Sequence, residues 1–262
     1  ECDKLISAVD NVDDLVSGVT GTANHNTINH LRAMGPDKRP YIVSEYAMRA
    51  LVEWNKLKSL EHLANVAKTL DNPAFDGWVL ELDFLTQLKL ACESGSREIE
   101  VFTATAESIK WPVSGFTVGM TIAGVSNGDD QFDFTPGQWL VPKRYNHGAF
   151  DAMQFVAADD IDDKLKARFV NVTRADRHDV KCQYMVDLLS ALKERWDEDP
   201  GDDEFPVLQV EFVWIRPNAR RGDAAIAPHM IDEWLLKPSP PYGFNWDATT
   251  ADVFFKRTAG GQ

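Results

Sequence analysis

The spacing of hydrophobic residues predicts helices in the first third of the chain. Hydrophobic positions recur every three or four residues from Tyr41 to Leu70, which is typical of helices. The stretch DGWVLELDFLTQLKLACESG, residues 76–95, shows the same period more clearly and ends at Gly95. Residues 1–40 carry Gly, Asn, Asp and Thr without a sustained period, so we predict irregular structure there with a short helix near residues 26–33.

After Gly95 the pattern changes to that of strands. The predicted strands are EIEVFTA at 98–104, two short pieces at 108–112 and 116–123, AFDAMQFVA at 149–157, KARFVNVT at 166–173, FPVLQVEFVWIRP at 205–217 and ADVFFKR at 251–257. The nearly continuous apolar run at 205–217 is typical of a strand in the buried middle of a sheet. A helix with Tyr184, Met185, Leu188 and Leu192 inward is predicted at 174–196.

This order of elements predicts the fold class. Without insertions it is helix, strand, strand, strand, helix, strand, which favours an α/β fold with a mixed central sheet flanked by helices. We divide the chain into an N-terminal irregular and helical extension at 1–72, a core at 73–218 with a β insertion at 105–147, and a C-terminal extension at 219–262. We expect the N-terminal extension to pack on the core within one compact domain.

Composition narrows the class of protein. The chain is 44% hydrophobic and 26% charged, which is ordinary for a globular protein, and no apolar run reaches the length of a transmembrane helix. Its N-terminus lacks a basic segment followed by an apolar one, so we expect no signal peptide. The three cysteines have no CxxC spacing, which favours free thiols over a structural zinc site.

The net charge of −14 opposes binding to nucleic acid at long range. Much of the acid lies in two blocks, residues 159–163 and 197–204, which we interpret as solvated loops. Between the two blocks lie six basic residues: Lys164, Lys166, Arg168, Arg174, Arg177 and Lys181. Within this local basic cluster we take Arg168, Arg174 and Arg177 as the candidate contacts to nucleic acid.

Glu81 is the first candidate for chemistry. It lies beside the inward stripe of the predicted helix, three residues after Trp78 and four before Leu85. A carboxylate at the core or its rim needs a cation or a hydrogen-bond donor. Glu81 is therefore either paired with a nearby Lys or Arg or part of an active site.

Two further candidates stand on successive strands. Asp151 shares a strand face with Met153 and Phe155, and Asn171 shares one with Thr173 on the next strand. If the two strands are neighbours, Asp151 and Asn171 converge at one edge of the sheet. Taken alone, either residue is more often a turn or strand-end hydrogen-bonding group than a metal ligand.

The helix after the second strand adds two more candidates. Thr173 begins the capping-box sequence TRAD, which gives it a structural role. His178 and Lys181 lie three residues apart and so face the same way. Lys181 heads the apolar stripe, and its ammonium either extends to solvent or reaches over the sheet edge toward Asp151. His178 is either a first-turn surface residue or a ligand.

This layout resembles the PD-(D/E)XK, restriction-endonuclease-like nucleases, with the lysine moved from the strand to the following helix. The blocks LVSGVTGTANHNTINHLRA, YIVSEYAMRAL, DGWVLELDFLTQL, FDAMQF and RFVNVTRADRHDVK resemble, in this order, the C-terminal effector domain of Crinkler proteins, known from oomycetes and some fungi. The resemblance covers roughly residues 13–215 and implies a restriction-endonuclease-like αβββαβ core with a mixed central sheet.

The resemblance also implies a site for Mg²⁺ or Mn²⁺. Asp151 would be the principal metal ligand, Glu81 would support the cation or its water, and Asn171 stands where the family usually has Glu or Gln. Lys181 would orient or activate the attacking water, with Thr173, His178 and Gln154 as supporting groups. The metal would neutralise charge on the scissile phosphate and lower the pKa of its bound water. An uncharged Asn171 supplies at most one carbonyl oxygen, so the metal should bind more weakly than among three carboxylates.

The function implied by the resemblance is Mg²⁺-dependent hydrolysis of phosphodiester bonds, in DNA more than in RNA. The protein would be a secreted virulence effector that acts in the host nucleus and causes cell death, with an NTPase domain upstream in the full-length protein. The alternative is a catalytically degenerate nuclease fold that binds host protein or nucleic acid. The charge of −14 and Asn171 favour this alternative. Membrane association is not expected.

Overall fold

The computed structural model describes residues 32–34, 40–42, 60–61, 63–65, 67–68, 73–103, 105–120, 134–142, 150–158, 164–173, 182–198, 207–217 and 247–255. The chain divides into two compact units, residues 1–87 with 257–262, and residues 88–256. The domain boundaries predicted from the sequence stay predictions.

The first unit contains a strand pair that the sequence did not predict. β1 (Arg32–Met34) and β2 (Pro40–Ile42) pair in antiparallel register. The helix expected near residues 26–33 is therefore wrong at its C-terminal end, and the helix expected from Tyr41 is wrong at its start. The sequence GPDK between the two strands carries turn signals, and these outweigh the weak helical period of the flanking residues.

α5 (Pro73–Ser94) confirms the helix predicted at residues 76–95. The helix begins at Pro73, and a proline at the first helical position loses no hydrogen bond within the helix. Gly95 follows the last residue of the helix with a φ of 74°, a left-handed conformation that glycine adopts readily at helix ends. The helix is buried on several sides and not only along one stripe: Val79, Leu80, Phe84 and Leu88 are all 0% exposed. Residues up to Gln87 belong to the first unit, and Leu88 begins the second.

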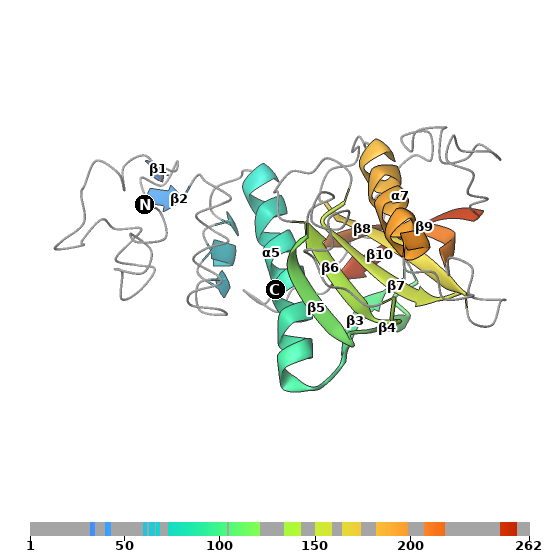
Figure 1. Ribbon diagram of the computed structural model, residues 1–262. Coiled ribbons are helices and arrows are strands. Elements are labelled where there is room, and N and C mark those ends of the chain that lie inside the picture. The colour runs from blue at the N-terminus through green and yellow to red at the C-terminus, as the bar shows by residue number, and fades with distance from the viewer. Residues whose placement is uncertain are drawn as a thin grey trace. The chain divides into compact units, whose positions relative to one another are not determined.

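In the described part of the chain, eight strands form one mixed sheet in the order β4–β3–β10–β9–β8–β7–β6–β5 (Figure 1). The neighbours β8, β9 and β10 run parallel, and β7 is antiparallel to both β8 and β6. The mixed α/β class predicted from the sequence is confirmed. The strands are β3 (Glu98–Phe102), β4 (Ser108–Pro112), β5 (Gly115–Met120), β6 (Gln138–Pro142), β7 (Ala152–Ala157), β8 (Leu165–Val172), β9 (Val207–Pro217) and β10 (Asp247–Phe255).

Most of these strands were predicted, with ends shifted by a few residues. β6 is the exception, because its five residues QWLVP form too short an apolar run to stand out among Gly and Pro. The β character predicted for residues 105–147 is confirmed by β4, β5 and β6. This segment is not all peripheral, since β6 pairs directly with β7.

α7 (Cys182–Glu198) packs on one face of the sheet, which we call the α7 face. It connects the parallel strands β8 and β9, as a helical crossover does. The shared core joins Met185, Leu188, Leu189 and Leu192 of the helix to Met153, Phe155, Ala167, Phe169, Val210, Phe212 and Trp214 of the sheet. Tyr184 was predicted to point inward, and this is wrong: it is 36% exposed, because the buried stripe is centred on Met185 and Leu189.

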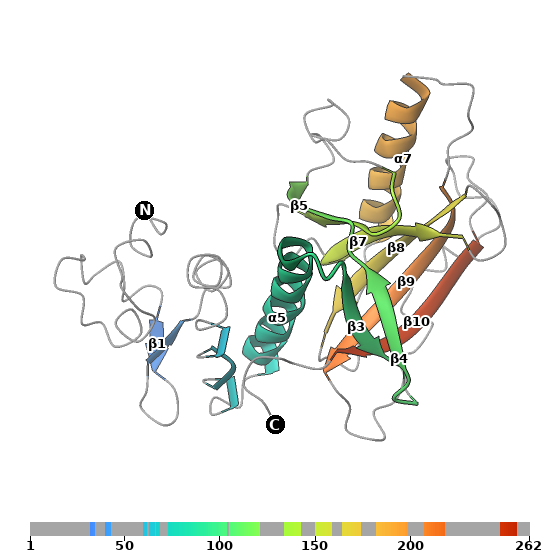
Figure 2. The same cartoon turned by 90° about the horizontal axis from the view of Figure 1, so that it is seen from below.

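β4 folds over the opposite face of the sheet, which we call the inner face. The Cζ atom of Arg168 on β8 lies 4.7 Å from the ring centroid of Trp111 on β4. Trp139 Nε1 on β6 donates a hydrogen bond to the Pro112 carbonyl at 3.0 Å. Strands far apart in the sheet order therefore meet across the inner face, with α7 on the other side (Figure 2).

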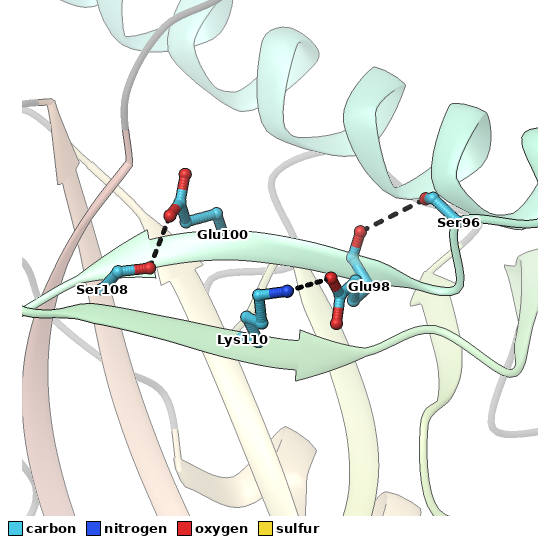
Figure 3. Close-up of polar contacts among 5 residues, drawn as sticks. All are labelled: Ser96, Glu98, Glu100, Ser108 and Lys110. Atoms are coloured by element: carbon cyan, nitrogen blue, oxygen red, sulfur yellow. Dashed lines mark hydrogen bonds and ion pairs between the residues drawn. The ribbon is translucent and has the colours of Figure 1, made fainter.

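The β3–β4 hairpin carries polar contacts on its exposed side (Figure 3). Lys110 Nζ lies 2.5 Å from Glu98 Oε1, and Ser108 Oγ donates to Glu100 Oε1 at 2.5 Å. The hydrogen bond with Glu98, and then its negative charge, raise the pKa of Lys110 above its ordinary value of 10.5. Such an exposed pair contributes little to stability.

Candidate functional site

Asp151 lies immediately before β7, where the strand's pairing with β8 becomes irregular. Its backbone nitrogen donates to the carbonyl of Val170 at 2.8 Å, although Val170 is the register partner of Ala152. Two successive residues thus face one residue of β8, which is the pattern of a β-bulge. Bulges redirect side chains near the ends of strands.

The Asp151 carboxylate has a defined partner. Its Oδ2 accepts a hydrogen bond from the backbone nitrogen of Val172 at 2.6 Å. Along β8 successive N–H groups point to opposite sides, and the next one, that of Thr173, donates to Ile215 of β9 at 2.9 Å. The Val172 N–H therefore faces the β7 side just beyond the start of that strand. The carboxylate takes the place of a backbone carbonyl there, as the strand-end reading of Asp151 predicted.

Asn171 lies on the α7 face, one strand away from Asp151. It shares that face with Phe169 and Ala167 by alternation along β8, and its partner on β9 is Trp214. The side chain is only 3% exposed, and in the described part of the structure its Oδ1 accepts no hydrogen bond. The prediction that Asp151 and Asn171 stand on neighbouring strands is confirmed, since β7 pairs with β8. The register ends at Ala152 and Val170, and the bulge at Asp151 interrupts it, so the predicted convergence of Asp151 with Asn171 stays a prediction.

Two further polar residues lie at the same end of the sheet. Thr173 follows β8 directly and is 5% exposed. Continuing the β8–β9 register beyond Val172 and Ile215 places it opposite Arg216, which is also 5% exposed and shares the face of Trp214. We call Asp151, Asn171, Thr173 and Arg216 the strand-end cluster. Sequence reasoning missed Arg216, although its place two residues after Trp214 in an alternating strand was a usable signal.

The remaining predicted ligand on a helix is Glu81. It is 8% exposed on α5, in agreement with the expected position at the core or its rim, and it interacts with other groups in the protein. Asp76 and Asp83 on the same helix are buried as well. Glu81 belongs to the first compact unit and the strand-end cluster to the second, so the predicted convergence of Glu81 with Asp151 stays a prediction.

Four predicted residues lie outside the described part of the chain. They are Arg174, Arg177, His178 and Lys181. The proposed water-activating role of the lysine and the nucleic-acid contacts of the two arginines stay predictions.

Gln154 and Arg168 point to the inner face and not to the strand-end cluster. Gln154 is directly opposite Arg168 across β7 and β8, and both positions alternate with the α7 face. The Arg168 Nε donates to Glu211 Oε2, and its guanidinium stacks on Trp111. This placement gives Arg168 a structural role and separates Gln154 from Asn171 by the thickness of the sheet. It does not support the predicted supporting role of Gln154 or the nucleic-acid contact of Arg168.

The donor set at the strand-end cluster fits part of a coordination sphere for a hard cation. Asp151 and Asn171 offer carboxylate and carbonyl oxygens, which Mg²⁺ prefers, and the unpaired Oδ1 of Asn171 is a suitable ligand atom. Among the described residues, no three or more His, Cys, Asp or Glu side chains come together in a group that could hold a metal ion, at this cluster or at any other place. Two protein oxygens leave most positions of an octahedral Mg²⁺ to water, substrate or further side chains.

Comparison with known proteins gives no further guide to the family. No family model, no curated protein and no solved structure matches this chain. No helix among the described residues is long and apolar enough to cross a membrane.

Proposed function

We propose that this chain is a Mg²⁺-dependent, nuclease-like domain that hydrolyses phosphodiester bonds, in DNA more than in RNA. The observation that carries the proposal is the position of Asp151, just before β7, and of Asn171, near the end of β8, at the same end of two neighbouring antiparallel strands. The two residues come from positions where the sequence resembles the metal-binding strands of PD-(D/E)XK nucleases.

The topology supports a restriction-endonuclease-like core. β6, β7 and β8 are consecutive antiparallel neighbours, α7 then crosses over, and β9 returns parallel to β8. This gives a strand, strand, strand, helix, strand order, but its first strand is β6, which lies in the segment predicted as an insertion. The predicted first core strand, β3, instead lies between β4 and β10. β10 extends the parallel part of the sheet on the far side of β9.

The residues of the strand-end cluster fit distinct tasks in such a site. The hydrogen bond from Val172 holds the Asp151 carboxylate in place before any ligand binds, which reduces the reorganisation needed at the site. Asn171 offers a neutral oxygen, and Arg216 adds positive charge at the end of the sheet where a phosphate would lie. Glu81 and Lys181 keep the roles that the family resemblance implies. When bound, Mg²⁺ would neutralise charge on the phosphate and lower the pKa of its water.

The biological setting in this proposal rests on the resemblance to Crinkler effector domains. The domain would belong to a secreted virulence protein that acts in the host nucleus, with an NTPase domain upstream. Host DNA would be the substrate, and cell death the outcome of its cleavage.

Cleavage of supercoiled plasmid by the purified chain tests the activity. We expect cleavage with Mg²⁺ or Mn²⁺ that stops with EDTA, and a loss of about 100-fold or more in Asp151→Asn. This replacement keeps an oxygen that can accept from Val172 and removes only the charge. The matched control is Glu107→Gln, an exposed residue with the same change in charge, which should cleave like the unmodified protein. Equal cleavage by Asp151→Asn, or cleavage insensitive to EDTA, contradicts the proposal.

The second candidate function is a degenerate nuclease fold that binds a host protein or nucleic acid without cutting. It is favoured by the existing use of the Asp151 carboxylate as a strand-end acceptor, and by the neutral Asn171. A folded protein that binds such a partner and shows no turnover with Mg²⁺ or Mn²⁺ would support it. Turnover that requires both Mg²⁺ and Lys181 would exclude it.

A further inference from the structure

The two outer strands of the described sheet differ in how their edges are protected. These strands are β4 and β5. An outer strand presents backbone N–H and C=O groups that can pair with a strand of another molecule, and proteins block such edges with charged residues and prolines. β4 carries both, since the Lys110 side chain is 65% exposed and Pro112 has no N–H. β5, with the sequence GFTVGM, carries neither.

β5 lies within a stretch that has no ionisable side chain. Residues 111–128 contain no Asp, Glu, Lys, Arg or His, although 26% of the whole chain is charged and its net charge is −14. Two copies of such a chain repel each other at long range. They approach most easily where the surface carries no acidic residue. Of the two outer strands of the described sheet, β5 is therefore the one that fits a second copy.

The exposure of Val118 shows that the side of β5 away from β6 is accessible. Val118 is 58% exposed, more than any other large hydrophobic residue in the described part of the chain. Its partner on β6, Val141, is only 2% exposed, because β5 lies on one side of it and β7 on the other. A further strand beside β5 would cover Val118 as β5 covers Val141.

The sequence of β5 is complementary to itself. Phe116 and Val118 pair with Trp139 and Val141 of β6, so they share one face of the strand and Thr117 takes the other. If two β5 strands run antiparallel about a two-fold axis at Thr117, Phe116 of each copy lies opposite Val118 of the other, and the two threonines face each other. Aromatic residues opposite β-branched ones, and threonine opposite threonine, are favourable cross-strand pairs.

We propose that two copies of this chain associate through β5, so that their sheets continue antiparallel across a two-fold axis at Thr117. The regular pairing of β5 with β6 runs from Gly115 to Val118 and shifts after Val118, so the interface is short. An interface of this size gives a weak dimer. Each chain has one β5, so association stops at two copies. The proposal does not rest on the proposed nuclease activity.

Analytical ultracentrifugation of the unmodified chain over a range of protein concentrations tests the association. We expect a monomer and dimer equilibrium that is at least about threefold tighter in about 0.5 M than in about 0.05 M NaCl, because salt screens the repulsion between two acidic chains. A basic partner strand would show the opposite dependence on salt. A monomer at every concentration, a dimer that salt weakens, or assemblies that grow beyond two copies overturns the proposal.

Val118→Lys tests the strand itself, because it places a charge on the unprotected edge at a side chain that is already mostly exposed. We expect the dimer to dissociate at least about tenfold more readily in this variant. The matched control is Ile109→Lys, which makes the same change at an exposed apolar residue of β4 and should dimerise like the unmodified chain. Equal dimerisation of the two variants contradicts a role for β5.

Thr117→Cys tests the two-fold axis. Residues directly opposite each other have Cβ atoms about 4.5–5.5 Å apart, close enough for a disulfide after a small adjustment. We expect mild oxidation to link two copies of Thr117→Cys, and reduction to separate them. The controls are the unmodified chain with its three cysteines and Ser108→Cys on β4. Linkage no greater than in these controls places any dimer on another surface and overturns the proposal, and this test decides even if Val118→Lys does not fold.

Discussion

The backbone nitrogen of Val172 donates a hydrogen bond to Asp151 Oδ2 at 2.6 Å, at the point where β7 begins and the ladder with β8 loses its backbone acceptor. A residue placed at this point has a structural task whether or not it binds a metal. The same contact holds the carboxylate at the end of the sheet where β8 carries Asn171. Strand-end capping and metal binding, treated as alternatives in the sequence, are therefore compatible in one side chain.

Replacing Asp151 should separate these two tasks. Asp151→Ala leaves the Val172 N–H without its acceptor, and we expect the free energy of unfolding to fall by about 1–3 kcal/mol. Asp151→Asn keeps an acceptor oxygen, so we expect a smaller loss of stability together with the full loss of cleavage. Urea unfolding followed by tryptophan fluorescence measures the stability of both variants, and the plasmid assay measures their cleavage. If the two variants are equally stable, the capping role of Asp151 is wrong.

Asn171 offers a test of metal binding that does not depend on turnover. Asn171→Asp places a second carboxylate in a buried position at the same end of the sheet as Asp151, which should lower the melting temperature in EDTA because a buried carboxylate near another negative charge is unfavourable. A cation between them offsets this repulsion, so Mg²⁺ should raise the melting temperature of Asn171→Asp more than that of the unmodified protein. Thermal unfolding with and without Mg²⁺ makes the comparison, with Asn171→Leu as the variant that should not respond. An Mg²⁺ response that is the same in all three proteins argues against a cation at this position.

The sequence predicted these neighbouring strands well because both faces of β7 and β8 are buried. Apolar residues on both faces of these strands leave few alternatives for strand position, and β7 pairs with β8 in continuous register from Ala152 to Ala157. Short elements were missed for the opposite reason: β6 has five residues and β1 and β2 have three each, too few for a period to show.

The chemistry of individual side chains was less predictable than the strands. Arg168 looked like a surface cation in the sequence, because nothing local shows that Glu211, 43 residues later, pairs with it and that Trp111 covers it. The buried amide of Gln154 likewise has no hydrogen-bond partner in the described part of the structure, which shows only when strands from distant parts of the chain enclose it. Contacts between distant segments decide which polar groups face solvent, and a single sequence does not contain them explicitly.

The exposed pair of Lys110 and Glu98 predicts a pH effect with a definite sign. Because Glu98 raises the pKa of Lys110, the pair contributes stability that is fully present below pH 10.5 and is lost as pH rises through the raised pKa. We expect the NMR titration of the Lys110 side chain to have its midpoint above 10.5. Glu98→Gln should return the midpoint toward 10.5, and high salt should do so in part. A midpoint that does not move in Glu98→Gln would show that the pair does not persist in solution.

The pairing of Arg168 with Glu211 predicts a large effect on stability and none on nucleic-acid binding. Glu211→Gln leaves a largely buried guanidinium without its carboxylate, and we expect the free energy of unfolding to fall by about 3 kcal/mol. Arg168→Met combined with Glu211→Leu removes both charges and retains packing against Trp111, so the double variant should be more stable than Glu211→Gln. Urea unfolding of Arg168→Met, Glu211→Leu and the double variant gives the coupling energy. Affinity for a fluorescent DNA duplex should be unchanged in Arg168→Met, and a marked loss of affinity at unchanged stability would instead make Arg168 a nucleic-acid contact.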